Sequence, residues 1–362
     1  MDYSRPEIPI GLDLSGQALL AWQATAERHL AFSITRACPL RCEHCIVSTV
    51  APAAARRFTV TGEQAAAWAA QLPDLAAAGV QRVTFTGGEP LLAPGVLEVL
   101  SRAAVGAGLE VTVVTAAHWG RDPRRVLDRF AHIRHWHLST DVFHTAFIPA
   151  TQVLATAAEA HRRGHDVVVR MAVDKPPTEQ QHDLYEQIRT GLPAGVGVDV
   201  EPVLHEGRAA DRPHAEYAPW RRSIPCISTG PVIHDDGAVS PCCGGLTDTP
   251  HQWPWPLPDA RHTGLGDVHR AWREQRALRL IRTVGLAPML AWARAAGVGV
   301  DEPPEHPCAT CVALWREPRA VAAIRQRLAD PAVVAKVDEL YEAVFAVGDT
   351  VQTHETGGGM PR

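Results

Sequence analysis

Six apolar segments rich in β-forming residues alternate with helical segments between residues 29 and 203, and this alternation constrains the fold more than any other feature. The segments predicted to be strands are residues 29–35, 80–86, 109–115, 135–139, 166–173 and 196–200. Alternation of strands and helices is the signature of parallel βα units. Such units form an open doubly wound sheet or a barrel. The sequence therefore predicts an α/β fold, with functional loops at the carboxyl ends of the strands.

Three cysteines, Cys38, Cys42 and Cys45, directly follow the first predicted strand at a C-x3-C-x2-C spacing. Thiolates this close together can bind one soft metal centre from a single loop. A [4Fe–4S] cluster normally takes four cysteines, so three local ligands leave one iron open to a small molecule. A structural zinc site uses four ligands, usually with paired C-x2-C units, and fits this triplet poorly. The triplet therefore predicts an open iron–sulfur cluster.

A second motif, Gly87-Gly88-Glu89-Pro90, follows the second predicted strand. Glycines at such a place let the backbone approach a ligand closely. Together the two motifs resemble those of the radical S-adenosylmethionine (SAM) superfamily. The resemblance implies a partial (β/α)6 TIM-like barrel, a SAM-binding [4Fe–4S] cluster on the triplet, and cleavage of SAM to a 5′-deoxyadenosyl radical. It also implies that residues 87–90 bind the amino group of the SAM methionine, with Glu89 reinforcing that contact.

Three further residues are candidates for SAM binding. His44 stands where the family usually has an aromatic residue near the adenine, although it could also be a solvent-facing loop residue. Ser139, at the end of the fourth predicted strand, could reach the SAM ribose, and a capped turn is the alternative explanation. Arg170 could pair with the SAM carboxylate, because a guanidinium binds a carboxylate through two hydrogen bonds. A structural ion pair is the alternative for Arg170.

Four cysteines further along the chain form a second candidate metal site. They are Cys226, Cys242, Cys308 and Cys311. Gly237 belongs to a hairpin turn signal, Asp-Asp-Gly, that would bring the first two together. The C-x10-G-x4-C spacing and the later C-x2-C pair resemble the SPASM and twitch extensions of radical SAM enzymes, which implies an auxiliary [4Fe–4S] cluster. The chain has no cysteine after Cys311, so the single-cluster twitch form fits better. A structural zinc on the same thiolates is the alternative.

The eighth cysteine, Cys243, is left over by this assignment and bears on the fate of the substrate radical. A thiol can return hydrogen to a carbon radical, so Cys243 is a candidate hydrogen donor in an epimerisation. A packing role is the alternative, and Cys242 could exchange roles with Cys243. A dehydrogenation would instead need a base near the barrel mouth, for which Asp141 and Glu201 are the main candidates. The remaining candidate bases are His144, Asp174 and His205.

The resemblance leaves the substrate open. Only 37 residues precede Cys38, and we expect no leader-binding domain there. This favours a sugar or aminocyclitol of a specialised metabolite such as an antibiotic, epimerised or dehydrogenated at a carbinol carbon. A ribosomally made peptide, epimerised or crosslinked through a thioether or carbon–carbon bond, is the alternative substrate. A non-enzymatic iron–sulfur or regulatory protein is a third hypothesis. A flavodoxin-type or ferredoxin-type protein is the expected reductant.

Charge and hydropathy exclude several classes of protein. The net charge of −5 and a pI near 6.4 argue against a nucleic-acid-binding surface. No apolar run approaches the ~20 residues of a membrane span. The N-terminus lacks the apolar core of a signal peptide, so we expect a cytoplasmic protein. We also expect three parts: a radical SAM barrel over residues 1–215, an auxiliary-cluster domain over 216–315, and C-terminal helices with a disordered tail over 316–362.

Overall fold

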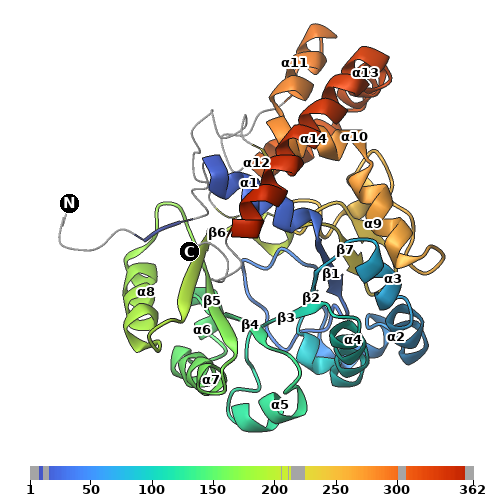
Figure 1. Ribbon diagram of the computed structural model, residues 1–362. Helices are drawn as coiled ribbons and strands as arrows, with labels where there is room; N and C mark the ends of the chain where they lie inside the picture. The colour runs from blue at the N-terminus through green and yellow to red at the C-terminus, as the bar shows by residue number, and fades with distance from the viewer. Residues whose placement is uncertain are drawn as a thin grey trace. The chain divides into compact units, whose positions relative to one another are not determined.

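The computed structural model describes residues 8–10, 16–204, 206–210, 212, 225–300 and 307–354 (Figure 1). The chain divides into two compact units. The first consists of Met1–Asp13, Ser33–Ala69 and Val83–Pro213, and the second of Leu14–Phe32, Ala70–Arg82 and His214–Arg362. Two segments of the N-terminal part therefore fold together with the C-terminal part of the chain.

A parallel β-sheet organises the first unit. Its strands are β2 (Arg82–Thr86), β3 (Glu110–Thr115), β4 (His135–Ser139), β5 (Asp166–Val173) and β6 (Gly197–Pro202), which neighbour one another in chain order. The pairs β3–β4, β4–β5 and β5–β6 are parallel, with Thr115 opposite Leu138 and Ser139 opposite Arg170. The predicted α/β fold with parallel strands is confirmed. The GGEP motif follows the carboxyl end of β2.

Helices follow the strands of the first unit, as the alternation predicts. They are α2 (Gly62–Ala69), α4 (Pro94–Gly106), α5 (Pro123–Arg129), α6 (Val142–Thr145), α7 (Ala150–Arg162) and α8 (Glu179–Gly191), with the short 3-10 turns η1 (Pro52–Arg57), η2 (Pro90–Leu92) and η3 (Gly207–Ala209). In Figure 1, α7 packs on β4 and β5, and α8 packs on β6. Trp136 and Leu138 of β4 and Leu97 of α4 are fully buried, so the helices cover an apolar sheet.

Two local features depart from the predicted pattern. The helix expected over residues 61–79 ends at Ala69, and a separate helix, α3 (Leu72–Ala77), follows it with Pro73 in its first turn. Proline lacks the N–H that would continue a helix through this point, which explains the break. The single-turn helix α6 is absent from the predicted pattern. The side chain of Asp141 caps it by accepting from backbone N–H groups.

The second unit is mainly helical. It contains α1 (Gly16–Glu27), β1 (His29–Ser33), α3, the antiparallel strands β7 (Val232–His234) and β8 (Val239–Ser240), η5 (Pro250–Gln252), α9 (Leu265–Arg273), α10 (Arg276–Val284), α11 (Ala287–Ala295), α12 (Pro307–Arg316), α13 (Pro318–Leu328) and α14 (Pro331–His354). Gly237 lies in the β7–β8 turn with φ of 82°, a conformation that glycine adopts readily. Trp253, Trp272 and Trp315 belong to one buried core in this unit.

The last helix, α14, packs against α1 and continues to His354. The rest of the tail that the sequence predicts to be disordered, residues 355–362, lies outside the described residues. Within the described part of the chain, no helix combines the length and the apolar character needed to cross a bilayer.

Candidate active site

The cysteine triplet lies in a loop that backbone hydrogen bonds tether at its entry and at its base. Ile34 N donates to Thr86 O at 3.0 Å, which joins the start of the loop to the end of β2. Cys38 N donates to Val50 O at 3.0 Å and closes the loop on itself. Cys42 is buried, whereas Cys38 and Cys45 are half-buried. Three thiols therefore share one short, tethered loop beside the end of β2.

Without a bound metal, the surroundings of the triplet favour the neutral thiol of Cys38. Burial raises the pKa of the Cys38 thiol to about 12, and the negative charges of Glu89, Cys42 and Cys45 act in the same direction. A backbone hydrogen bond from Leu40 N to Cys38 Sγ, at 3.4 Å, opposes these effects only in part. A bound iron centre would offset them, because a metal deprotonates its thiol ligands. The donor set and its burial therefore suit an iron–sulfur cluster.

The Gly87–Gly88 pair packs against the chain that enters the triplet. Gly88 N donates to Thr35 O at 2.6 Å. A Cβ atom on Gly87 would lie 2.2 Å from Thr35 O, and one on Gly88 would lie 2.3 Å from Ala37 O. Gly87 also has φ of 137°, which disfavours other residues. The sequence predicts that the glycines let the backbone approach a ligand closely. In the structure, the backbone of Gly87 and Gly88 closely approaches Thr35 and Ala37 of the protein itself, and this contact joins the GGEP segment to the cluster loop.

Glu89 is fully buried and ties the GGEP segment to the end of β3. Its carboxylate accepts from Thr115 Oγ1 at 2.8 and 3.0 Å and from Ala116 N at 3.0 Å. It also accepts from Leu91 N at 3.1 Å, at the start of the η2 turn that Pro90 opens. Both oxygens therefore have donors within the protein, so Glu89 shapes the segment that the sequence assigns to SAM.

A third segment, after β6, also contacts the cluster loop. Arg208 N donates to Cys45 O at 2.9 Å, and Arg208 Nη2 donates to Thr49 Oγ1 at 3.0 Å. A Cβ atom on Gly207 would lie 2.6 Å from Cys45 O, and Gly207 has φ of 58°. The loop thus contacts GGEP near its entry and residues 207–208 near Cys45.

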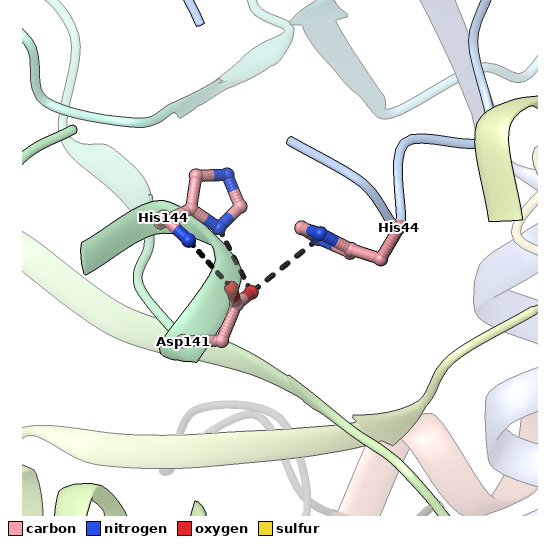
Figure 2. Close-up of side chains that lie close together, drawn as sticks. All are labelled: His44, Asp141 and His144. Carbon is pink, nitrogen blue, oxygen red and sulfur yellow. Dashed lines mark hydrogen bonds and ion pairs between the residues drawn. The ribbon is translucent and has the colours of Figure 1, made fainter. Parts of the chain in front are cut away.

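His44, Asp141 and His144 converge next to the triplet (Figure 2). Asp141 Oδ2 lies 2.8 Å from His144 Nδ1 and 3.4 Å from His44 Nε2. The His44 ring stacks on Phe143, with ring centres 4.6 Å apart. The three possible ligand atoms lie within 4.8 Å of one another, a spacing that could also hold a metal ion. Sequence reasoning named all three residues but did not predict their mutual contact, which depends on the unforeseen turn α6.

Burial and charge act in opposite directions on these three groups. Burial lowers the pKa of His44 to about 4, against the attraction of Asp141. Burial also lowers the pKa of His144. The Asp141 carboxylate and a hydrogen bond with Cys42 outweigh this effect and raise the pKa of His144 to about 10. Burial alone would raise the pKa of Asp141, and His144 and His44 hold it below its usual range. Asp141 and His144 therefore form a buried carboxylate–imidazolium pair.

Arg170 and Glu201 contact each other across β5 and β6. Arg170 forms an ion pair with Glu201, and its Nε lies 3.5 Å from Asp199 Oδ2. Burial raises the pKa of Asp199, and the charge of Glu201 adds to this, while Arg170 opposes it. Ser139, the third residue expected here, is half-buried and lies opposite Arg170 in the β4–β5 register. The guanidinium is therefore engaged by acids of the protein itself.

Arg212 is a site residue that sequence reasoning missed. It pairs with Glu43 at 3.1 Å and with Asp174 at 3.2 Å, and its guanidinium lies 4.6 Å from the centre of the Phe143 ring. Asp174, a predicted candidate base, is thereby held in an ion pair. Arg212 lies in a stretch without periodicity, so no spacing signal marked it. His205, another predicted base, lies outside the described residues.

The second cysteine set gathers within the second unit. Cys308 and Cys311 are one turn apart at the start of α12. Burial raises the pKa of Cys242 well above its usual value, and the nearby thiols of Cys308, Cys226 and Cys243 raise it further. Backbone and ring N–H groups point at these sulfurs: Ser228 N at 3.4 Å from Cys226 Sγ, and Trp315 Nε1 at 3.0 Å from Cys311 Sγ.

Cys243 differs from the other cysteines because it is exposed. Its sulfur lies 3.3 Å from Thr229 Oγ1 and 3.6 Å from Ser228 Oγ. Its backbone N–H also donates to Ser228 Oγ at 3.3 Å. The thiol is thus held by two hydroxyl groups of the segment that follows Cys226.

Comparison with known protein families identifies one domain of the chain. Residues 32–188 match the family model of the Radical SAM superfamily, so the chain contains a radical SAM domain. The matched region includes the triplet, the GGEP segment and strands β2 to β5. Its parallel α/β architecture is consistent with the partial TIM barrel of radical SAM enzymes. Membership of the domain in this family implies a [4Fe–4S] cluster and SAM as cofactors.

Three known proteins resemble the chain. The putative peptide biosynthesis protein YydG of Bacillus subtilis (strain 168) is 22% identical over 175 residues, which are 45% of this chain and 54% of the relative. The chain thus spans about half the length of this curated relative. Streptococcus suis SuiB bound to S-adenosylmethionine matches with a TM-score of 0.47 and 15% identity, over 71% of this chain and 68% of that one. BtrN in complex with AdoMet and 2-DOIA matches with a TM-score of 0.39 and 13% identity, over 70% and 87%. Both TM-scores are below 0.5, so the assignment rests on the family model.

Proposed function

We propose that the protein is a radical SAM enzyme that removes hydrogen from a C–H bond of its substrate. The observation that carries this proposal is the tethered triplet loop, whose entry is hydrogen-bonded to the GGEP segment through Gly88 and Glu89. Cys38, Cys42 and Cys45 would hold three irons of a [4Fe–4S] cluster and leave the fourth open. When bound, the cluster supplies the electron that cleaves SAM into methionine and a 5′-deoxyadenosyl radical.

Residues of the same unit would bind and orient SAM. The Glu89 and Pro90 carbonyl oxygens accept from Leu92 N and Ala93 N, so the carbonyl oxygens of Gly87 and Gly88 are the ones that we propose for the SAM ammonium group. The half-buried His44 ring, stacked on Phe143, provides a flat surface for the adenine. Ser139 at the end of β4 is proposed to contact the ribose. Arg170 has two candidate roles, a structural ion pair and binding of the SAM carboxylate. Because Asp199 and Glu201 already lie beside its guanidinium, binding of the SAM carboxylate is the weaker of the two.

We further propose that Cys226, Cys242, Cys308 and Cys311 hold an auxiliary [4Fe–4S] cluster in a twitch-like part of the second unit. The effect of the Cys308 and Cys226 thiols on the Cys242 pKa and the N–H groups directed at the Cys226 and Cys311 sulfurs support this assignment. Fully ligated clusters take four cysteines, and hydrogen bonds to the sulfurs are common around them. Iron rather than zinc is favoured because the same chain carries a radical SAM domain.

A peptide is the substrate class that we propose. Its support is the sequence relative YydG, whose name places it in peptide biosynthesis. The sugar or aminocyclitol substrate is the second candidate. The similarity to BtrN adds no support for it, because its TM-score is 0.39. A flavodoxin-type or ferredoxin-type protein is the proposed reductant.

Epimerisation is the reaction that we propose, because Cys243 offers an exposed thiol. The 5′-deoxyadenosyl radical would take a hydrogen atom from the substrate carbon and become 5′-deoxyadenosine. The Cys243 S–H bond would then break to return a hydrogen atom from the opposite side, so the product keeps the oxidation state of the substrate. The sulfur radical left behind needs one electron from the reductant and one proton from solvent to regenerate the thiol.

Replacing Cys38, Cys42 and Cys45 together with Ala tests the first step. Anaerobically reconstituted wild-type protein with SAM and dithionite should form 5′-deoxyadenosine, measured by liquid chromatography and mass spectrometry, and the triple variant should form none above background. Iron should fall from about eight to about four per chain as one of two clusters is lost. Production of 5′-deoxyadenosine by the triple variant at the wild-type rate would overturn the proposal.

In the same assay, Cys243→Ala should still cleave SAM but should not place solvent deuterium on the substrate carbon. An epimerised, deuterium-labelled product from this variant would remove Cys243 from the mechanism. Sugar and peptide substrates are distinguished by which of them stimulates formation of 5′-deoxyadenosine.

A further inference from the structure

The buried indole of Trp315 donates its ring N–H to the sulfur of Cys311. Trp315 Nε1 lies 3.0 Å from Cys311 Sγ, and Trp315 is 5% exposed. An indole N–H can only donate, and a buried one needs an acceptor. Trp272 of the same unit meets this need with an oxygen, since its Nε1 donates to Pro241 O at 2.8 Å. Trp315 instead directs its one polar group at a cysteine of the second set.

The helical spacing of α12 places this donor beside its acceptor. Cys311 and Trp315 are four residues apart, so they lie on the same face of the helix. Side chains of a helix lean toward its N-terminus, and the indole of Trp315 therefore covers the turn that carries Cys311. Cys308, three residues before Cys311, shares this face. The contact thus follows from the local geometry of one helix.

The segment that follows Cys242 packs on the same helix. A Cβ atom on Gly245 would lie 3.0 Å from Cys308 Cβ and 3.3 Å from Val312 Cγ2. Glycine at this place lets the backbone approach the helix more closely than a residue with a side chain would allow. Because Gly245 is three residues after Cys242, this close approach brings the Cys242 segment against the cysteines of α12.

Two further tryptophans hold the Trp315 ring in place. The rings of Trp253 and Trp255 meet it nearly edge to face, with centres 5.2 and 5.4 Å away and interplanar angles of 85° and 84°. Aromatic pairs prefer this arrangement. Gln275 fixes both neighbours, because its Oε1 accepts from Trp253 Nε1 and its Nε2 donates to Trp255 O, each at 2.7 Å. The indole is thus supported by a hydrogen-bonded loop while it faces Cys311.

We propose that Trp315 is a positioning residue whose N–H group raises the reduction potential of the auxiliary cluster. The inference rests on the proposed function, since it requires Cys311 to be a cluster ligand. A neutral thiol is a weak acceptor, whereas hydrogen bonds to an ionised group are stronger. An N–H donor draws electron density from a ligand sulfur and so favours the reduced cluster, and such bonds are among the features that set cluster potentials. Burial strengthens the hydrogen bond further.

The test compares Trp315→Phe with Trp255→Phe in full-length protein in which Cys38, Cys42 and Cys45 are replaced with Ala. This background should carry only the auxiliary cluster, with about four irons per chain. Each protein is reconstituted anaerobically, its iron and zinc are counted, and the midpoint potential is measured by a redox titration followed by electron paramagnetic resonance (EPR). Trp315→Phe removes the donor and should shift the potential to a more negative value. Trp255→Phe removes a neighbouring indole and should match the background.

A second measurement reports the contact itself. The same proteins are labelled with tryptophan that carries nitrogen-15 in its indole ring, and pulsed EPR of the reduced cluster detects indole nitrogens coupled to it. The background and Trp255→Phe should show a coupling that Trp315→Phe lacks, which a purely structural role for the ring does not predict.

An unmoved potential in Trp315→Phe would overturn the inference alone and leave the auxiliary cluster in place, as would a background spectrum without indole coupling. If Trp315→Phe retains no iron, the background spectrum decides: a coupled indole nitrogen supports the inference, and its absence overturns it. A background protein that binds zinc, or no metal, would overturn the proposed auxiliary cluster and this inference together.

Discussion

Glu27→Gln should destabilise the second unit strongly, because Glu27 is the acid of a buried ion pair. Glu27 is 5% and Arg282 is 3% exposed, and their side chains are directly paired. Arg273 Nε reaches the other Glu27 oxygen at 2.6 Å. Burial alone would raise the pKa of Glu27, but chiefly Arg282, with Tyr341 and Arg273, holds it below its usual value. Glu27 is therefore ionised, and its removal leaves the Arg282 charge uncompensated.

The expected loss follows from this geometry. Removing one partner of a buried ion pair costs about 3–5 kcal/mol. Glutamine keeps the volume and one carbonyl oxygen, and the half-exposed Arg273 can turn to solvent. We therefore expect the lower end, about 3 kcal/mol, which is roughly a 100-fold change in the folding equilibrium.

Glu27→Gln should also weaken cluster binding by the second cysteine set, because α1 contacts the segment that carries Cys226. Trp22 Nε1 donates to Ile227 O at 2.8 Å, and Gln23 Nε2 donates to Cys226 O. Urea unfolding of the apo protein under reducing conditions, followed by circular dichroism, measures the change through the midpoint and slope. Iron counting after reconstitution measures retention of the auxiliary cluster.

The matched control is Asp267→Asn. Asp267 pairs with Arg270 on α9, and both side chains are about 60% exposed (59% and 62%), so its loss should cost no more than about 0.5 kcal/mol. A Glu27→Gln variant within about 0.5 kcal/mol of the wild type would refute the reasoning from burial.

Two further predictions concern the cluster loop and the pH dependence of stability. Gly88→Ala should lose the iron bound by the triplet, because the new Cβ atom would lie 2.3 Å from Ala37 O. The control Gly95→Ala should keep this iron, because a Cβ atom at Gly95 would meet nothing within 4 Å. Equal iron contents in the two variants would contradict the packing argument. Burial lowers the pKa of His29 in the folded protein to about 4 from 6.5, so the unfolded chain binds a proton first as pH falls. The free energy of unfolding should therefore decrease from about pH 6.5 toward pH 4, by up to about 3 kcal/mol, and His29→Gln should flatten this slope in urea titrations at several pH values.

The sequence predicted those parts of the structure that local patterns determine. Apolar strands and helix signals located β2 to β6, because each depends on a short window of residues. The motifs place Cys38 and Gly88 each shortly after a predicted strand, and in the structure their segments are joined by the hydrogen bond from Gly88 N to Thr35 O. Pro73 shows the limit even of local reasoning, since an alanine-rich pattern concealed a helix break that one proline causes.

Contacts that depend on three-dimensional packing could not be predicted from local sequence patterns. The Asp141–His144 pair requires the turn α6, which is too short to leave a periodic signal. Arg170 carries no mark in the sequence that would assign it to Glu201 rather than to a ligand. Helix α1 belongs to the second unit, where Glu27 pairs with Arg282 far along the chain. Such pairings follow from the completed fold, because either residue alone is an ordinary polar residue.

The most direct test of the central claim is the EPR spectrum of the dithionite-reduced, reconstituted protein with and without SAM. A cluster held by Cys38, Cys42 and Cys45 alone has an open iron that can bind SAM. We predict that SAM changes the signal in the wild type, and that this SAM-responsive signal is absent when the three cysteines are replaced with Ala. A wild-type spectrum that SAM leaves unchanged would contradict the account.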